Sequence, residues 1–234
     1  MFLVVSKKTL RLLFLFCMII LSSFFVCAST KVTSISPANK YCVVLDAGHG
    51  GIDVGSVGES GIFERDLNLS VTQKIKRLLN TLNIDVVETR KTQDGLYGEF
   101  AHGFKQKDMK ERKKIIDSSN ADLVVSIHMN YFKDSSAHGA QVFYKPGCLK
   151  SKTLAKATQN LFQKNLFKAR KEPLKGDFFI LTCSEKPGIL VECGYLSNRE
   201  EEALLISQEY QNKLAYQIFC GIVSFFDIKT IENI

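Results

Sequence analysis

Apolar and polar positions follow one another along the chain in blocks that predict strands and helices in turn. Aliphatic and β-branched runs typical of buried strands cover 41–46, 84–89, 121–130, 139–144, 178–183 and 188–193. Apolar residues at helical spacing predict helices over 65–82, 109–118, 154–166 and 207–226. Asn198, ahead of a run of glutamates, predicts a further helix start. This alternation predicts an α/β fold: a single-domain three-layer sandwich, with a mostly parallel twisted sheet flanked by helices on both faces.

The first forty residues carry a different pattern. Three basic residues, Lys7, Lys8 and Arg11, precede an apolar run from 12 to 26, which is shorter than the roughly 20 residues of a comfortable bilayer crossing. Because small residues around Ala28 offer a cleavage site, we expect residues 1–28 to be a secretory signal peptide. An uncleaved membrane anchor is the alternative. Residues 29–40 are polar, and we expect them to form a linker. We expect residues 41–228 to form one folded domain outside the membrane.

Charge and cysteine content narrow the class of protein only slightly. The chain has 31 Lys and Arg against 24 Asp and Glu, and removal of the three leader charges leaves a net charge of +4. A mild positive charge suits an anionic polymer but is also common on ordinary surfaces. The chain has no basic block interleaved with aromatic residues, so nucleic-acid binding is not expected. Five cysteines lie beyond residue 28, without a CxxC pair, which argues against a zinc ribbon or a disulfide framework, and we expect most of them in the core.

Three polar side chains stand out at or near the ends of apolar runs. His49 lies in a glycine-rich turn after the strand at 41–46, and His128 lies near the end of the strand at 121–130. A lone histidine in such a turn is more often a capping residue than a ligand, but the carboxyl ends of parallel strands form the usual site of α/β sheets. Glu192 interrupts the apolar strand at 188–193, where a carboxylate is costly unless it is paired or functional. An ion pair with a core-facing Lys or Arg, such as Arg90 or Arg112, is the alternative explanation for Glu192.

Two histidines and a carboxylate from different elements fit a catalytic zinc site, which uses three protein ligands and leaves one position open. Glu64, at the start of the first helix, is the expected third ligand, with Glu59 and Asp66 as alternatives. Zinc activates water and polarises an amide carbonyl, so a second carboxylate is needed to move the proton. Partial burial would raise the pKa of Glu192 towards neutrality and suit it to that task.

Five segments resemble, in the same order, successive motifs of the zinc-dependent N-acetylmuramoyl-L-alanine amidases of the AmiC-like class. They are residues 45–51, 64–69, 89–90, 126–130 and 190–198, and the resemblance covers nearly all of 41–226. It implies that His49, Glu64 and His128 bind one zinc ion per chain and that Glu192 is the catalytic acid/base. Residues 41–228 are therefore expected to be an amidase catalytic domain.

The same motifs suggest further roles and one departure. Asn130 and Arg90 lie in two of them and are the expected substrate-binding residues. Ala47 stands where the family usually has proline, which slightly loosens the turn without removing a ligand. His102 and His138 match no ligand motif.

The resemblance implies hydrolysis of the amide between the lactyl group of N-acetylmuramic acid and the L-alanine of the peptidoglycan stem peptide. Within the family the chain is most similar to the sporulation and germination amidases. That similarity implies action in the spore cortex, or the space between the forespore membranes, before a partner deacetylase helps to form muramic-δ-lactam. A vegetative wall-remodelling amidase, a peptidoglycan-binding module without turnover and a zinc carboxypeptidase-like peptidase are the alternatives. Because no wall-binding repeat is present, an accessory or activating exported protein is an expected partner, and membrane contact is expected only through the N-terminal segment.

Overall fold

The computed structural model describes residue 8, residues 41–99 and residues 102–227 of the 234-residue chain. Apart from Lys8, the predicted signal peptide and linker lie outside these described residues. Among the described helices, none has both the length and the apolar character that a membrane crossing needs.

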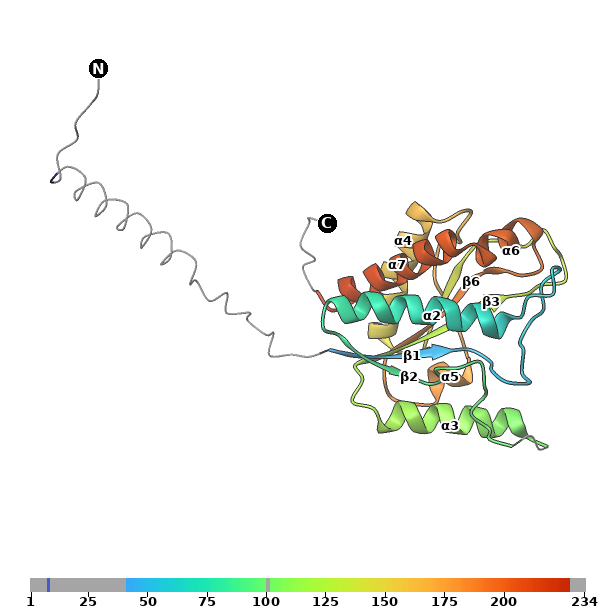
Figure 1. The fold of residues 1–234 in the computed structure, drawn as a ribbon, viewed down its shortest axis with the longest axis horizontal. Helices are drawn as coiled ribbons and strands as arrows, with labels where there is room; N and C mark the ends of the chain where they lie inside the picture. The colour runs from blue at the N-terminus through green and yellow to red at the C-terminus, as the bar shows by residue number, and fades with distance from the viewer. Residues whose placement is uncertain (1–7, 9–40, 100–101, 228–234) are drawn as a thin grey trace, which may run out of the picture. The chain divides into compact units, whose positions relative to one another are not determined.

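One mixed sheet forms the centre of the domain (Figure 1). Its strands, in spatial order, are β2 (Asp85–Glu88), β1 (Cys42–Ala47), β3 (Leu123–Asn130), β6 (Gly188–Tyr195), β4 (Gln141–Tyr144) and β5 (Leu174–Lys175). The first four run parallel, β4 is antiparallel to β6, and β5 is parallel to β4. The carboxyl ends of β1, β3 and β6 therefore lie at the same edge of the sheet, and the prediction of a mostly parallel sheet is confirmed.

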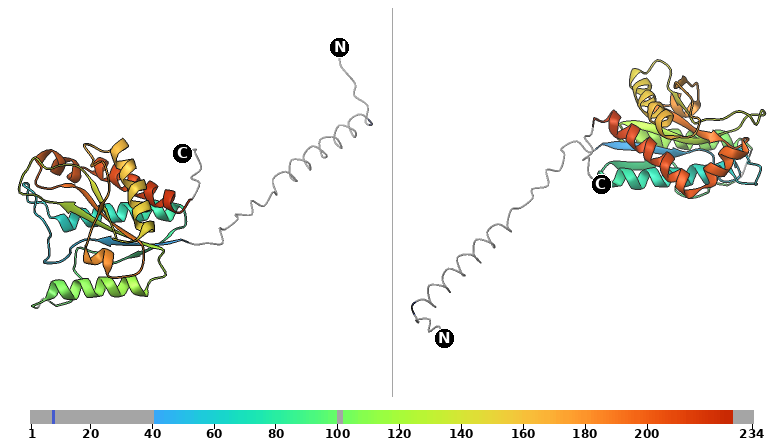
Figure 2. Two further views of the ribbon diagram at one scale, coloured as in Figure 1. Left: turned by 180° about the vertical axis from the view of Figure 1, so that it is seen from behind. Right: turned by 90° about the horizontal axis from the view of Figure 1, so that it is seen from above.

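Helices cover both faces of this sheet, which confirms the three-layer arrangement (Figures 1 and 2). One face carries α2 (Glu64–Thr81), α4 (Leu149–Asn165), α6 (Arg199–Ile206) and α7 (Gln208–Phe225). Within the described residues, the other face carries α3 (Phe104–Ser118) and the four-residue α5 (Phe179–Thr182). The predicted helix start at Asn198 is confirmed, because its side chain accepts a hydrogen bond from the Glu201 amide at 3.1 Å.

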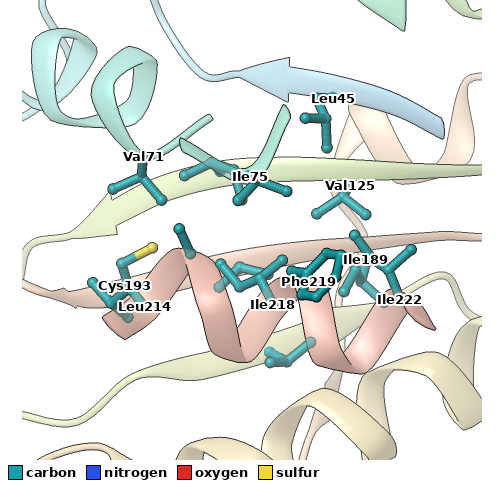
Figure 3. Close-up of a cluster of buried hydrophobic side chains, with 14 of the residues drawn as sticks. Leu45, Val71, Ile75, Val125, Ile189, Cys193, Leu214, Ile218, Phe219 and Ile222 are labelled. Carbon is teal, nitrogen blue, oxygen red and sulfur yellow. The ribbon is translucent and has the colours of Figure 1, made fainter. Parts of the chain in front are cut away.

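Alternation along the central strands sends side chains into two separate cores. Val43 and Leu45 face the larger core under α2 and α7, whereas Val44 faces the smaller core under α3 and α5. Figure 3 shows the larger core, where Leu45, Val125 and Ile189 pack against residues of α2 and α7. Burial on both faces explains why these strands have consecutive apolar residues rather than one at every second position.

Four elements differ clearly from the predictions. The run at 178–183, predicted as a strand, forms α5, where only Ile180 and Leu181 are buried. A short apolar run cannot be assigned by periodicity alone, and here a single helical turn is enough to place two side chains in the smaller core. Helices α3 and α4 begin five residues earlier than predicted, and β5 was not predicted at all.

Most cysteines are less deeply buried than predicted. Among the five in the described residues, Cys193 alone is fully buried, and no disulfide joins any of them. Cys42, Cys183 and Cys220 pack partly buried against the two cores.

Candidate metal centre

The three predicted metal ligands converge at the carboxyl edge of the sheet. His49 follows β1, His128 lies near the end of β3, and Glu64 is the first residue of α2. One donor atom from each lies within 4.8 Å of the other two. Of the competing carboxylates, Glu59 is exposed and Asp66 pairs with Arg65, so neither joins the cluster.

The glycine-rich turn after β1 gives His49 its position. Its backbone has a left-handed φ of 62°, which is unusual for a residue with a side chain. Gly50 and Asp53 close the turn through reciprocal backbone hydrogen bonds of 2.9 and 3.1 Å. A Cβ atom on Gly48 would lie 2.2 Å from the His128 ring, so only glycine allows the two segments to approach this closely.

Glu64 bridges the two histidines. Its Oε1 atom lies 3.2 Å from His49 Nε2 and 3.1 Å from His128 Nδ1, and its Oε2 atom accepts the Ser56 amide at 2.8 Å. Burial opposes ionisation, but hydrogen bonds and charge from the two histidines hold the pKa of Glu64 well below its usual range.

The donor set fits a zinc ion. Tetrahedral zinc with bonds of about 2.0–2.1 Å places its ligand atoms about 3.3 Å apart. The two contacts of Glu64 Oε1, at 3.2 and 3.1 Å, are close to that spacing. Two imidazoles and one carboxylate are also the ligand types of catalytic zinc sites, which leave a further position for water or substrate.

A second carboxylate holds the other nitrogen of His49. Asp53 Oδ2 lies 3.0 Å from His49 Nδ1, and Asp53 Oδ1 lies 3.0 Å from Lys105 Nζ. Burial alone would lower the pKa of His49, but the Asp53 and Glu64 carboxylates outweigh it and raise the pKa to about 9 in the metal-free protein.

Glu192 lies next to the cluster without an ion-pair partner among the described residues. It is the register partner of His128 on the neighbouring strand, so the two side chains point to the same face of the sheet. Its Oε2 atom is buried and has no hydrogen-bond partner. Burial, helped by the charge of Glu64, raises the pKa of Glu192 to about 7.

The ion-pair explanation for Glu192 is wrong, because both candidate arginines are engaged elsewhere. Arg112 pairs with Asp46 and Asp108. The Arg90 guanidinium donates to the carbonyls of four residues in and around the glycine-rich turn, namely Ala47, Gly48, Arg65 and Thr92. Arg90 is 2 % exposed and supports the turn from within the protein.

Substrate binding by Arg90 and Asn130 stays a prediction. The four backbone contacts of Arg90 favour a structural role instead. Asn130 ends β3, is partly buried, and accepts the Tyr131 amide through its side chain at 2.8 Å. His102 and His138 are not in the metal-capable cluster, and His138 instead contacts the Ser136 carbonyl.

Sequence reasoning missed the polar network beneath the metal cluster. Arg112, 1 % exposed, donates to Asp46 Oδ1 at 2.6 Å and to the Ala47 carbonyl at 2.8 Å. It also donates to the backbone carbonyl of His49, so it supports the segment that carries the ligand. Hydroxyls of Ser126 and Thr89 donate to Asp46 at 2.6 and 2.7 Å. Burial would raise the pKa of Asp46, but Arg112 and these hydroxyls together lower it to about 2.

A cavity of about 280 Å³ opens beside the two ligand histidines. Its apolar lining includes Tyr97, Phe104, and Phe178 and Phe179 at the start of α5. Phe178 and Phe179 are 36 % and 48 % exposed, respectively. The sequence prediction missed this wall because it placed these two residues in a strand. Metal donors, an unpaired carboxylate and an adjoining cavity can together perform metal-assisted hydrolysis.

Comparison with known proteins agrees with this chemistry. The family model described as N-acetylmuramoyl-L-alanine amidase matches residues 43–224. The germination-specific N-acetylmuramoyl-L-alanine amidase of Bacillus subtilis is 34 % identical over 197 residues, which cover 82 % of this chain and 83 % of the relative.

Two solved structures share the fold. The CwlD amidase from Clostridioides difficile, in complex with the GerS lipoprotein, is 36 % identical with a TM-score of 0.76. The match covers 82 % of this chain and 100 % of that one. An N-acetylmuramoyl-L-alanine amidase from Clostridium difficile 630 is 31 % identical with a TM-score of 0.73, over 82 % of this chain and 100 % of that one.

Proposed function

Because this chain belongs to the N-acetylmuramoyl-L-alanine amidase family, we propose that it hydrolyses its substrate with one zinc ion held by His49, Glu64 and His128. The bond broken joins the lactyl group of N-acetylmuramic acid to the L-alanine of the peptidoglycan stem peptide. The observation that carries the proposal is the convergence of three donor atoms within 4.8 Å of one another, beside the unpartnered carboxylate of Glu192.

Glu192 is the proposed acid/base. When bound, zinc supplies a Lewis acid that polarises the amide carbonyl and makes water more acidic. The Glu192 carboxylate accepts a proton from the attacking water and returns it to the nitrogen of the departing L-alanine. Its pKa of about 7 in the metal-free protein suits both directions of transfer near neutral pH. The neighbouring cavity provides room for the groups that flank the amide.

A role in spore cortex, rather than in the vegetative wall, is the narrower part of this proposal. Its support is the likeness to the germination-specific amidase of Bacillus subtilis and to the CwlD amidase of Clostridioides difficile. The enzyme would then act outside the membrane, and the stripped muramic acid would be passed to a deacetylase before lactam closure. A vegetative wall amidase remains the second candidate, since the chemistry at the site is the same.

An exported helper protein is part of the same proposal. The CwlD amidase was solved in complex with the GerS lipoprotein. An insoluble polymer is a difficult substrate for a lone catalytic domain, and a membrane-attached partner would hold the enzyme near it. Co-purification from the producing cells, compared with the activity of the isolated protein, tests this part separately.

The test combines metal analysis with product analysis. We expect the purified protein to bind one zinc ion per chain and to release intact stem peptides that begin with L-alanine, identified by mass spectrometry. His128→Ala should lose both properties. Release of single C-terminal residues would indicate a carboxypeptidase, and zinc-dependent binding of glycan without hydrolysis would indicate a binding module. Faster digestion of cortex than of vegetative peptidoglycan would support the sporulation role, and the reverse preference would refute it.

A further inference from the structure

We propose that Asp53 is a positioning residue for the metal ligand His49, resting on the zinc site of the proposed function. Asp53 contacts the ring nitrogen that faces away from Glu64: the Nδ1 to Oδ2 distance is 3.0 Å. The other nitrogen, Nε2, lies 3.2 Å from Glu64 Oε1 and is the atom available to the metal. A carboxylate that accepts the Nδ1 proton fixes the tautomer in which Nε2 carries a lone pair.

Only one of the two ligand histidines has such support from a side chain. His128 uses Nδ1 towards Glu64. Its ring orientation is restricted instead by the close approach of Gly48 to the same ring. His49 lies in a turn and is half-buried, so its ring depends more on a hydrogen bond for its orientation.

Lys105 orients Asp53 in turn. Its ammonium group lies 3.0 Å from Asp53 Oδ1, which leaves Oδ2 for the histidine. Lys105 is on α3, whereas Asp53 is in the turn after β1, so the pair joins two separate segments. The lysine side chain is 66 % exposed, so the pair is screened by water and its own contribution is small.

A purely structural role for the Asp53 side chain is the competing explanation. The turn is already closed by backbone hydrogen bonds between Gly50 and Asp53, which any residue at position 53 except proline could make. Removal of the carboxylate should therefore leave the turn in place and act on the imidazole alone.

The experiment measures zinc affinity by competition with a chelator in the full-length protein. We expect Asp53→Ala to weaken zinc binding about 10- to 100-fold, the usual range for outer-shell partners of metal-bound histidines. Asp53→Asn keeps an acceptor and should fall between Asp53→Ala and the wild type. Lys105→Met should weaken binding by no more than a few-fold. The matched control is Asp66→Asn. The Asp66 side chain is 26 % exposed, compared with 23 % for Asp53, but it pairs with Arg65 and not with a histidine.

Two further readouts separate positioning from folding. The far-UV circular dichroism spectrum of Asp53→Ala should match that of the Asp66→Asn control, which shows that the variant is folded. In the zinc-loaded wild type, the hydrogen bond to Asp53 should protect the His49 Nδ1 proton from exchange with water, and ¹H–¹⁵N spectra should show that this signal is lost in Asp53→Ala. Zinc affinity within three-fold of the wild type in Asp53→Ala would overturn the proposal, as would an equal loss in Asp66→Asn or a loss accompanied by unfolding of the variant in circular dichroism. If the wild-type protein itself binds no zinc, the proposed function fails. If it binds zinc and hydrolyses peptidoglycan while the Asp53 variants bind zinc normally, only this inference fails.

Discussion

Two carboxylates on the same face of the sheet have pKa values that are shifted in opposite directions. Asp46 on β1 is 1 % exposed, and its pKa is lowered to about 2. Glu192 on β6, with one carboxylate oxygen buried, has its pKa raised to about 7. Strand β3 lies between them and contributes Ser126 beside Asp46 and His128 beside Glu192.

The difference comes from partners rather than from burial. Desolvation raises the pKa of both groups. Asp46 overcomes it with the Arg112 guanidinium and two hydroxyl donors, whereas Glu192 Oε2 has no hydrogen-bond partner. A satisfied carboxylate stabilises the fold, and an unsatisfied one next to metal ligands is available for proton transfer.

The largest effect is expected from Glu192→Gln, which keeps the shape of the side chain but cannot accept a proton. The rate of stem-peptide release should fall about 10²- to 10⁴-fold, the usual contribution of a general acid/base. Zinc should remain at one ion per chain, because Glu192 is outside the metal-capable cluster. Initial rates on purified peptidoglycan and metal analysis of the same sample provide the test. A fully active variant would exclude Glu192 as the acid/base.

Arg112→Met should produce the largest loss of stability, because it leaves the Asp46 carboxylate buried without its cation. Breaking a buried pair in this way costs about 3–5 kcal/mol. Denaturation midpoints in urea measure the change. Lys114→Met is the control on the same helix: its ammonium group is exposed and pairs with Glu111 at 3.4 Å, so no measurable change is expected. Equal effects of the two substitutions would show that the Asp46 region is not a satisfied network.

Acid should remove the contribution of Asp46. Its pKa is lowered from the usual 3.8 of an aspartate to about 2 in the folded protein, so its stabilising effect is present above about pH 4 and is lost as the pH falls through about 2. The shift corresponds to about 2.5 kcal/mol. The difference in unfolding free energy between the wild type and Asp46→Asn should therefore shrink by most of that amount, about 2 kcal/mol, from pH 5 to pH 2. A constant difference over this range would contradict the lowered pKa.

Glu192 should have the opposite pH dependence in the metal-free protein. Because folding raises its pKa from 4.5 to about 7, the folded state holds the proton more tightly, and stability falls as the pH rises from about 4.5 to 7. Glu192→Gln should thus gain on the order of 1–2 kcal/mol over the wild type between pH 4 and pH 8, after allowance for partial exposure. Chemical denaturation in the presence of a chelator measures this gain. If the gain is absent or reversed, Glu192 has a partner in solution.

The sequence was sufficient to predict the central strands and the metal cluster for related reasons. Strands β1, β3 and β6 are buried on both faces, so their sequences are mostly apolar and easy to identify. His49 and His128 lie at the carboxyl ends of two such strands, and Glu64 begins the helix that follows the first. Parallel strands bring these ends together by topology alone, without any detailed knowledge of packing.

The remaining features depend on contacts between distant segments. Asp46 lies in as apolar a run as Glu192, yet nothing near it in the sequence identifies Arg112, 66 residues away, as its partner. The α5 segment has the composition of a strand, yet it forms a helical turn over the smaller core. Residue type and spacing therefore predicted which groups carry chemistry, but not which groups neutralise one another.

Helix α3 is attached directly to the segment that carries His49. Of the fifteen residues in this helix, only Arg112 and Ile116 are buried. Arg112 donates to the carbonyls of both Ala47 and His49, so a large part of the docking passes through one guanidinium. If the hydrogen bonds of this guanidinium break, the helix and the turn that carries His49 lose their shared contact at the same time. Amide hydrogen exchange should accordingly find α3 and residues 47–51 opening as one cooperative unit, with a shared protection factor lower than that of the central strands.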